Sequence, residues 1–332
     1  MEINLLEKVD LQKLVSKRDG ETKLGEKVLC GGEYLLDNLS DCPAQFVVFG
    51  IPEDAGPRAN LGKAGANSAW NAFLPKFVNV QHNQFLEGES ILLVGAFDFT
   101  QLEGYGSSNL SKLRSLVAKI DDVISEFVEQ VARAEKIPIA IGGGHNNAYG
   151  MLKGTSNALG KAINCINLDP HADYRELEGR HSGNGFSYAK KNGFLADYFV
   201  SCLHESYNSQ QLLDKMNADG VNYNFWDAVL RDEITFDDAI MEGFNAVKAS
   251  TFGVELDCDS IQDFPSSAQS PNGISTDQAR KFILQVASYK NAAYLHLPEA
   301  APDLVIDSRD QVGKLLAYLV SDFVKVAKKN HE

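Results

Sequence analysis

The sequence lacks the features that mark secreted, zinc-ribbon and membrane-spanning proteins. Its five cysteines are odd in number and scattered, and none belongs to a Cys-x-x-Cys pair. This pattern indicates reduced thiols rather than a disulfide framework or a zinc ribbon. The first residues have neither the basic nor the apolar region of a signal peptide, and no apolar run approaches the length of a membrane span. We therefore expect a soluble, cytoplasmic protein.

Clusters of positive charge are also absent from the sequence. Acidic residues outnumber basic ones by 45 to 31, which gives a formal net charge of −14. This balance argues against nucleic acid and against anionic membrane surfaces as partners. There is no low-complexity linker and no internal repeat, and 332 residues with 44% hydrophobic content are enough for one large core. We expect a single domain over residues 45–332, with residues 1–44 as an N-terminal extension packed on it.

Short apolar runs alternate with helical patterns along the chain. In 111–134 the apolar residues recur at i, i+3 and i+4, which predicts a helix capped by Asn109 or Ser111. Strands buried on both faces that alternate with helices predict a mainly parallel sheet covered by helices on each side. The expected strands are 45–51, 91–97, 137–141, 163–168, 198–202, 251–256 and 293–297, and the main expected helices are 67–77, 111–134, 148–159, 277–288 and 310–328.

Three residues of metal-ligand type follow the apolar run 163–168, at alternate positions. They are Asp169, His171 and Asp173. In extended backbone, side chains at i, i+2 and i+4 project to one side, so we expect these three to converge. Two carboxylates and an imidazole resist joint burial unless a cation lies between them. The alternative is a turn with capping aspartates, helped by Pro170.

Two further strand ends carry similar groups. Gly142-Gly143-Gly144 lets the backbone turn sharply and delivers His145, although a loop histidine is commonly a solvated side chain. Asp257 and Asp259 follow the run 251–256, although an ordinary surface strand can alternate in the same way. In open α/β sheets, ligands bind beyond the carboxyl ends of the strands. Four aspartates and two histidines, with no thiolate, favour two bridged Mn²⁺ ions over one structural zinc.

These motifs resemble the signatures of the ureohydrolase family, which comprises arginases, agmatinases and formimidoylglutamases. The match runs in the family's order from about residue 45 to the C-terminus. Three departures stand out: Pro170 replaces the usual Ala, Glu255 replaces Ser, and the acid and proline that often follow the Asp-x-Asp pair are missing. The matching segments are Gly50-Ile51-Pro52-Glu53-Asp54, Gly142-Gly143-Gly144-His145, Asp169-Pro170-His171-Ala172-Asp173, Glu255-Leu256-Asp257-Cys258-Asp259 and Glu299-Ala300-Ala301-Pro302.

The resemblance implies a three-layer α/β/α sandwich with a mainly parallel central sheet, and a homo-oligomer with two Mn²⁺ ions per subunit. Asp169 and Asp257 are expected to bridge the two ions. His145 and Asp173 complete the ligand set of one ion, and His171 and Asp259 complete that of the other.

The implied activity is hydrolysis of a C–N bond, other than a peptide bond, in a linear amidine or guanidine. Glu299 is expected to hold the cationic amidinium and Asp259 to carry a proton to the leaving nitrogen. His181 is a second candidate shuttle, but Ser182 can align in its place. The predicted substrate contacts are Arg175, Asn184 and Glu299.

The Ser-Gly loop that begins at Ser182 resembles formimidoylglutamases most. Arg175 suits a substrate with carboxylates, because a guanidinium binds a carboxylate at two points. Both features favour hydrolysis of N-formimidoyl-L-glutamate to L-glutamate and formamide, in histidine breakdown. The alternatives are agmatinase, guanidinobutyrase or arginase activity releasing urea, a two-metal phosphoesterase, and a non-catalytic, metal-stabilised interaction protein. The loop 205–208 matches no pattern and is a candidate contact with the substrate or a neighbouring subunit.

Overall fold

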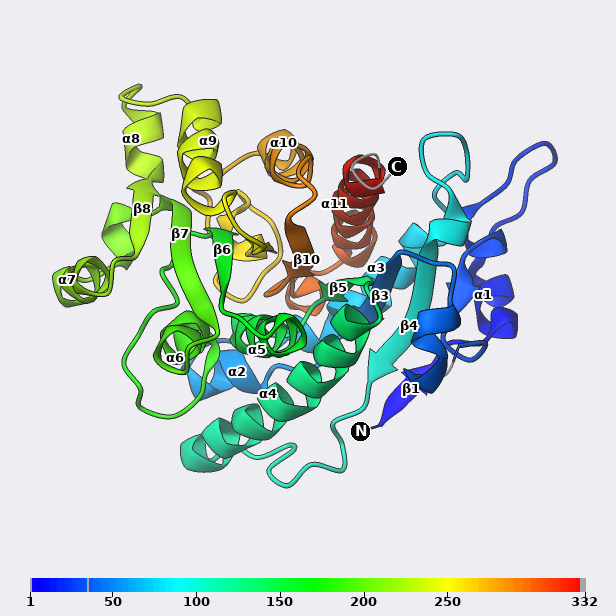
Figure 1. The fold of residues 1–332 in the computed structure, drawn as a ribbon, viewed down its shortest axis with the longest axis horizontal. Helices are drawn as coiled ribbons and strands as arrows, with labels where there is room; N and C mark the ends of the chain where they lie inside the picture. The colour runs from blue at the N-terminus through cyan, green and yellow to red at the C-terminus, as the bar shows by residue number, and fades with distance from the viewer. Residues whose placement is uncertain (1, 35, 329–332) are drawn as a thin grey trace.

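A twisted sheet forms the middle layer of the protein (Figure 1). The computed structural model describes residues 2–34 and 36–328. Within them the strands run in the order β1-β4-β3-β5-β10-β9-β6-β7-β8, with β2 also paired to β4. Every pairing is parallel except that of β1 with β4. The strands are β1 Ile3–Leu5, β2 Leu29–Cys30, β3 Phe46–Gly50, β4 Ile91–Phe97, β5 Ile137–Ile141, β6 Ile163–Leu168, β7 Leu195–Leu203, β8 Asn222–Phe225, β9 Phe252–Leu256 and β10 Ala292–Leu297.

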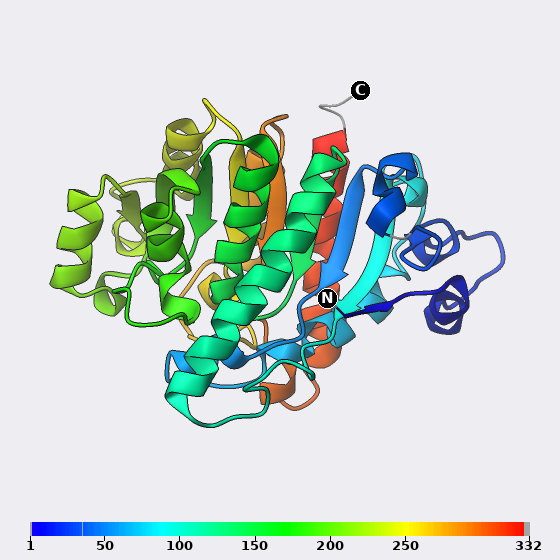
Figure 2. The same cartoon turned by 60° about the horizontal axis from the view of Figure 1, so that its bottom comes forward.

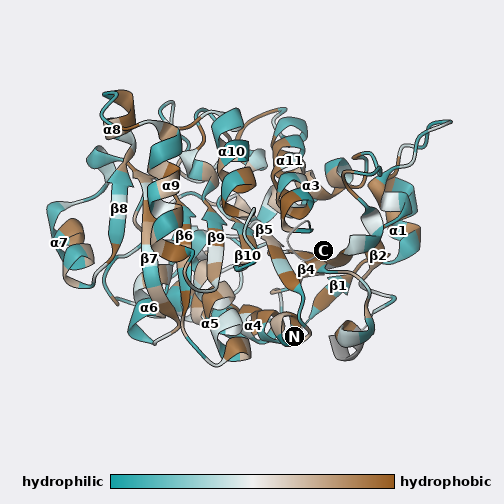
Figure 3. Ribbon diagram, turned by 45° about the horizontal axis from the view of Figure 1, so that its top comes forward, coloured by the Kyte–Doolittle hydropathy of each residue, from teal (hydrophilic) through white to brown (hydrophobic). Residues whose placement is uncertain are grey.

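Helices cover both faces of this sheet, and Figure 3 shows the two helical layers on either side of the strands. One buried apolar cluster joins the sheet to α3, α9, α10 and α11, and a second joins it to α4, α5 and α6. The expected three-layer α/β/α sandwich with a mainly parallel sheet is confirmed. The longer helices are α3 Ala69–Phe77, α4 Leu110–Arg133, α5 Ala148–Leu159, α9 Phe236–Val247, α10 Thr276–Val286 and α11 Arg309–Lys328, and the shorter ones are α1 Lys8–Leu14, α2 Ala55–Ala59, α6 Gly185–Lys191, α7 Gln210–Ala218 and α8 Trp226–Leu230.

The strongest sequence patterns coincide with the observed elements. The bounds of β4, β5, β6 and α5 are those predicted. Asn109, rather than Ser111, caps α4, because its side-chain oxygen accepts a hydrogen bond from Lys112 N at 3.1 Å. The patterns missed the strands β1, β2 and β8 and the helices α2, α6, α7, α8 and α9. β8 is a four-residue, half-polar strand, which carries too little periodicity to be recognised.

The N-terminal segment extends the sheet at one edge. β1 and β2 both pair with β4, and Figure 2 shows this segment on the opposite side of the molecule from α7 and α8. The fold also brings together basic residues that are far apart in the sequence. A hollow of about 800 Å³ between this segment, α3 and α11 is lined by Arg18, Lys23, Lys76, Lys314 and Lys325.

None of the helices in the described part of the chain combines the length and the apolar character needed to cross a bilayer.

Candidate metal centre

Four neighbouring strands bring the polar strand ends together at one edge of the sheet. β5, β10, β9 and β6 are adjacent in that order, and all run parallel. His145 and Glu299 follow the first two strands, and Asp257 and Asp169 follow the other two. The sheet therefore places the three predicted motifs, and Glu299 with them, at its carboxyl edge. This is where ligands bind in parallel α/β folds.

The loop after β5 is held in place by a buried carboxylate. Gly142 and Gly143 have φ of +83° and +72°, a conformation that glycine adopts without strain. Glu53 Oε1 accepts hydrogen bonds from Gly144 N at 2.9 Å and from Asn147 Nδ2 at 2.7 Å. Glu53 is only 3% exposed, and these neutral donors compensate its burial. It holds the backbone before His145 and the Asn147 side chain after it, a role that the resemblance to the family's early turn did not reveal.

The predicted ligands converge by paired turns rather than by extended backbone. Asp169 Oδ1 accepts a hydrogen bond from His171 N at 2.7 Å, and Asp257 Oδ1 accepts one from Asp259 N at 2.7 Å. Asp173 has φ of +46°, outside any strand conformation. The expectation that strand alternation aligns these side chains is therefore wrong. In both motifs the first aspartate turns the chain through its own side chain, which leaves its second oxygen pointing into the site.

Three carboxylates surround one nitrogen of His145. Its Nδ1 lies 2.9 Å from Asp257 Oδ2, 3.0 Å from Asp173 Oδ2 and 3.1 Å from Asp169 Oδ2. The His145 side chain is 0% exposed, and neither ring nitrogen makes a well-directed hydrogen bond. One nitrogen carries at most one proton, so it cannot satisfy three carboxylate oxygens. A divalent cation with oxygen and imidazole ligands fits this donor set, and these four residues form one cluster of closely spaced ligand atoms.

The pKa values of these groups reflect the same crowding. Burial opposes protonation of His145, but the four carboxylates around its ring, those of Asp169, Asp173, Asp257 and Glu255, outweigh burial and raise its pKa well above the ordinary value. Burial, together with Asp259 and Asp169, raises the pKa of Asp257 well above the ordinary value. The protein thus concentrates more negative charge here than it can stabilise alone. A bound cation relieves this repulsion.

The other two predicted ligands, His171 and Asp259, are less tightly clustered. His171 Nδ1 lies 3.6 Å from Asp169 Oδ1 and 4.0 Å from Asp259 Oδ2, and the His171 side chain is 31% exposed. Asp259 is held from the other side, because its Oδ1 accepts a hydrogen bond from Ala268 N at 2.9 Å. All six predicted metal ligands therefore lie around one site, four of them tightly clustered and two at its solvent side.

A cavity of about 230 Å³ opens over this cluster. Glu299 lines it and accepts a hydrogen bond from His145 N through Oε1 at 2.7 Å, while its buried Oε2 has no partner. Arg175 also lines it, and its Nη1 donates to Asn60 Oδ1 at 3.0 Å. The cavity therefore offers an acidic group and a cationic group to a ligand. Its lining includes Asn60, His171, Asp173, Arg175, Ser182, Tyr207, Asp257, Asp259 and Glu299.

Tyr207 forms one wall of the cavity. Its ring stacks on His171, with centroids 5.3 Å apart and planes inclined by 15°, and on His204 at 5.1 Å. The loop 205–208, which matched no sequence pattern, therefore contacts a predicted metal ligand. The sequence offered this loop as a candidate contact, but an isolated aromatic residue leaves no periodic signal, so the structure was needed to single out Tyr207 within it.

Two of the predicted site residues lie away from the cavity. His181 Nδ1 accepts a hydrogen bond from Gly183 N at 3.2 Å, and His181 Nε2 faces Glu178 Oε1 at 3.1 Å. Asn184 is fully buried, and its amide oxygen accepts from Arg180 Nη1 and from His181 N. Neither residue lines the cavity, and the side chains of both are occupied by their own loop. The structure therefore places His181 and Asn184 within the loop that carries Ser182, while their roles as proton shuttle and substrate contact stay predictions.

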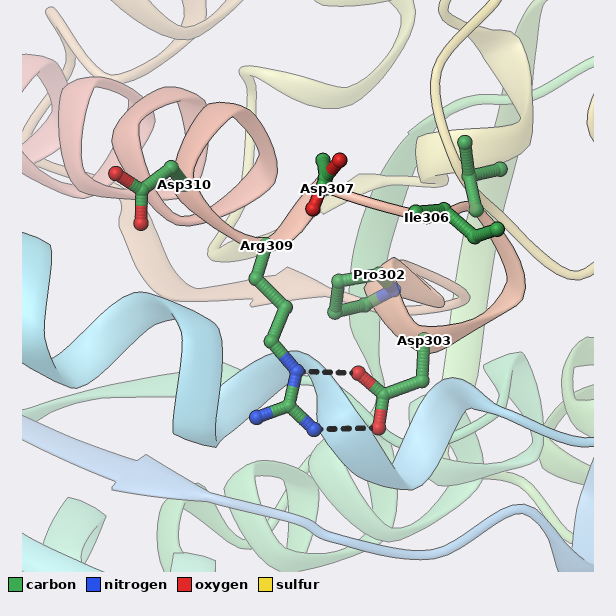
Figure 4. A pocket seen from close by; sticks show the side chains of 7 residues that line it. Pro302, Asp303, Ile306, Asp307, Arg309 and Asp310 are labelled. Atoms are coloured by element: carbon green, nitrogen blue, oxygen red, sulfur yellow. Dashed lines mark hydrogen bonds and ion pairs between the residues drawn. The ribbon is translucent and has the colours of Figure 1, made fainter.

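The segment after Glu299 is anchored to the start of α11. Arg309 Nε donates to Asp303 Oδ1 at 2.5 Å and Nη2 donates to Asp303 Oδ2 at 2.6 Å, beside a surface hollow (Figure 4). Ser308 Oγ donates to Pro302 O at 2.6 Å. These bonds tie the two ends of the segment together. They limit the freedom of the backbone that presents Glu299.

Comparison with known proteins finds matches over most of the chain. The model of a family described as the Arginase family matches residues 44–324. A formimidoylglutamase of Macrococcus caseolyticus is 26% identical over 279 residues, 82% of each chain. The crystal structure of formimidoylglutamase from Bacillus subtilis has a TM-score of 0.77 at 16% identity, covering 95% of this chain and 94% of that one. That of Trypanosoma cruzi formiminoglutamase with Mn²⁺ has a TM-score of 0.70 at 20% identity, covering 87% and 96%.

Proposed function

Because this chain belongs to the arginase family, we propose that it is a binuclear manganese hydrolase that converts N-formimidoyl-L-glutamate to L-glutamate and formamide. The observation that carries the proposal is the cavity in which an unpartnered Glu299 oxygen, a cluster of metal-ligand residues and Arg175 face the same space. A cationic amidine with carboxylates at its other end needs all three. The relative from Macrococcus caseolyticus bears the name of this activity, which supports the choice of substrate.

We assign the metal ligands as the sequence predicts them. His145, Asp169, Asp173 and Asp257 would hold one Mn²⁺ ion, and Asp169, His171, Asp257 and Asp259 would hold the other. The tight cluster about His145 Nδ1 supports the first set, and the contacts of His171 with Asp169 and Asp259 support the second. When bound, two such ions lower the pKa of water so that hydroxide forms at neutral pH.

The side chains of the cavity then orient the substrate and move a proton. Glu299 Oε2 accepts N–H bonds from the amidinium, which places the carbon to be attacked over the ligand cluster. Asp259 Oδ2, which lies 3.4 Å from Ser267 Oγ at the cavity wall, takes the proton from the oxygen that has attacked the amidine carbon and passes it to the leaving nitrogen. Arg175 binds a carboxylate of the substrate, with its guanidinium held by Asn60.

We also propose that residues 45–332 form one domain on which residues 1–44 pack, and that the enzyme is a cytoplasmic homo-oligomer. The pairing of β1 and β2 with β4 supports the first statement. The five cysteines are all free and buried, which suits a reducing compartment. The homo-oligomer is what the family resemblance implies.

Reconstitution of the metal-free protein with Mn²⁺ tests the proposal. Formimidoylglutamate, agmatine, guanidinobutyrate and arginine are supplied in parallel, and formamide and urea are measured together with manganese per chain. We expect formamide from formimidoylglutamate alone and two manganese ions per chain, with both lost in Asp257→Ala. Release of urea from a guanidine would show that formimidoylglutamate is the wrong substrate assignment. Two bound ions without turnover of any of the four would overturn the activity.

A further inference from the structure

A second buried acid lies behind the proposed metal centre. Glu255, on β9, is 0% exposed, and its Oε2 lies 3.4 Å from His145 Nε2, on the side of the imidazole away from the carboxylate cluster. Nδ1 of the same ring faces Asp169, Asp173 and Asp257. Glu255 therefore faces the one nitrogen of His145 that the metal does not need.

Glu255 is itself held by two side chains of the neighbouring strand. His296 on β10 is its register partner across the parallel pair, and His296 Nδ1 lies 2.7 Å from Glu255 Oε2. Tyr294 OH donates to Glu255 Oε1 at 2.9 Å. His296 Nε2 faces the carbonyl oxygen of Gly142 at 3.4 Å. The Nδ1–H of His296 and the hydroxyl of Tyr294 can therefore both donate to the Glu255 carboxylate and fix its position.

The chemistry of a histidine ligand explains why an acid in this position matters. To bind a cation through Nδ1, His145 must keep its proton on Nε2, and the neutral ring can equally carry it on Nδ1. An anionic acceptor beside Nε2 selects the first tautomer and makes Nδ1 a stronger donor to the metal. Glu255 is a charged acceptor at this position, and it stands where the family signatures have Ser.

We propose that Glu255 is a positioning residue that fixes the tautomer and orientation of His145 for manganese, and that His296 and Tyr294 hold Glu255 in place. This inference rests on the proposed function for the identity of the metal. We call this arrangement the relay: the Glu255 carboxylate orients the His145 imidazole, which binds the metal, and His296 holds Glu255. These three residues come from three adjacent strands, β9, β5 and β10.

The same residues could instead form a metal site of their own, because the ligand atoms of His145, Glu255 and His296 lie close together. The geometry favours the relay. A separation of 2.7 Å between His296 Nδ1 and Glu255 Oε2 is that of a charge-assisted hydrogen bond, and a proton between them accounts for it without a cation.

Equilibrium binding of Mn²⁺ to the metal-free protein, followed by calorimetry and by metal analysis, tests the relay without using activity. We expect the manganese Kd to rise about 10-fold in Glu255→Gln, which keeps the shape and removes the charge, and about 100-fold in Glu255→Leu. The exposed Glu126→Gln is the matched control and should leave the Kd unchanged. Circular dichroism and the melting temperature of each metal-free variant report whether it folds.

A double-mutant cycle separates positioning from a general structural role. If Glu255 acts through His145, then Glu255→Gln should change the Kd less than about 2-fold once His145→Ala is present. An equal effect in both backgrounds would overturn the proposal, as would a wild-type Kd in Glu255→Gln. Three manganese ions per wild-type chain that fall to two in His296→Gln would show a metal site instead of a relay. No manganese uptake by the wild type would overturn the proposed function and the relay together, whereas normal uptake with unaffected Glu255 variants would overturn the relay alone.

Discussion

Arg180 and Asp121 form a two-point ion pair in the interior of the protein. Arg180 Nε lies 2.7 Å from Asp121 Oδ2, and Nη2 lies 3.1 Å from Oδ1, with both side chains at least 94% buried. Nη2 also donates to Asn146 O at 3.0 Å, one residue past His145. The ion pair therefore connects the loop that carries Arg180 to helix α4 and to the backbone beside His145 in the proposed metal centre.

Removing one partner of this pair should destabilise the protein severely. Arg180→Met leaves the Asp121 carboxylate buried without a counter-charge, which typically costs about 3–5 kcal/mol. Urea unfolding of the metal-free protein measures the loss. The double variant Arg180→Met with Asp121→Leu should recover part of it, since no lone charge remains. A loss below about 1 kcal/mol in Arg180→Met would show that water or another group compensates Asp121.

Arg175 should determine the affinity for a carboxylate-bearing substrate. Arg175→Met removes a charge-assisted hydrogen bond worth about 1.5–3 kcal/mol, so we expect KM for formimidoylglutamate to rise about 10- to 100-fold with kcat within about 3-fold. Steady-state kinetics with the manganese-loaded enzyme provides the measurement. Arg133→Met, which breaks an exposed pair with Glu129, is the control. An unchanged KM would mean that Arg175 does not contact the substrate.

Glu299 should act on turnover rather than on metal binding. Glu299→Gln keeps an oxygen for the backbone N–H of His145 but removes the ionisable acid that faces the cavity. We expect kcat/KM to fall about 10²-fold, since charge-assisted hydrogen bonds to the amidinium weaken, while manganese per chain stays at the wild-type value. Metal analysis of the same preparation separates the two effects. Loss of manganese in this variant would place Glu299 in the metal site.

His181 should make the stability of the metal-free protein depend on pH. Burial lowers the pKa of His181 to about 4, outweighing the opposite effect of Glu178. In the folded state His181 resists protonation. Its contribution to the free energy of unfolding is therefore fully present above the ordinary pKa of 6.5, and it is lost as the pH falls from 6.5 towards 4. The loss is at most about 3 kcal/mol, given the depth of the shift and solvent screening.

The variant His181→Asn tests this dependence. Asn keeps an acceptor for Gly183 N and does not titrate, so the free energy of unfolding should fall less between pH 7 and pH 5 than in the wild type. His82→Asn is the matched control, since His82 Nδ1 also accepts a backbone N–H, from Gly88. If the free energy of unfolding falls equally with pH in the wild type and in His181→Asn, His181 is not the cause of the pH dependence.

Local patterns were most informative where strands end. A buried apolar run followed by acids or by Gly-Gly-Gly-His locates a strand and its polar end together, which is why β5, β6 and β9 and the polar residues that follow them were all predicted. The arrangement of the side chains after those strands was not predicted. Asp169 and Asp257 turn the chain through bonds to the second N–H beyond them, and these compete with extended backbone in a way that residue spacing does not encode.

The sequence by itself determined the layers, the order of the motifs and the types of polar residue at the strand ends, because periodicity and strand-end chemistry are local properties. The tertiary structure decided which polar residues meet. His181 and Asn184 follow the ligand loop closely in the sequence, yet their side chains are used within their own loop. His296 lies 41 residues from Glu255 in the sequence and still faces it, because β10, which carries His296, pairs with β9, which carries Glu255. Strand order results from packing of the whole chain, so no local pattern could assign these partners.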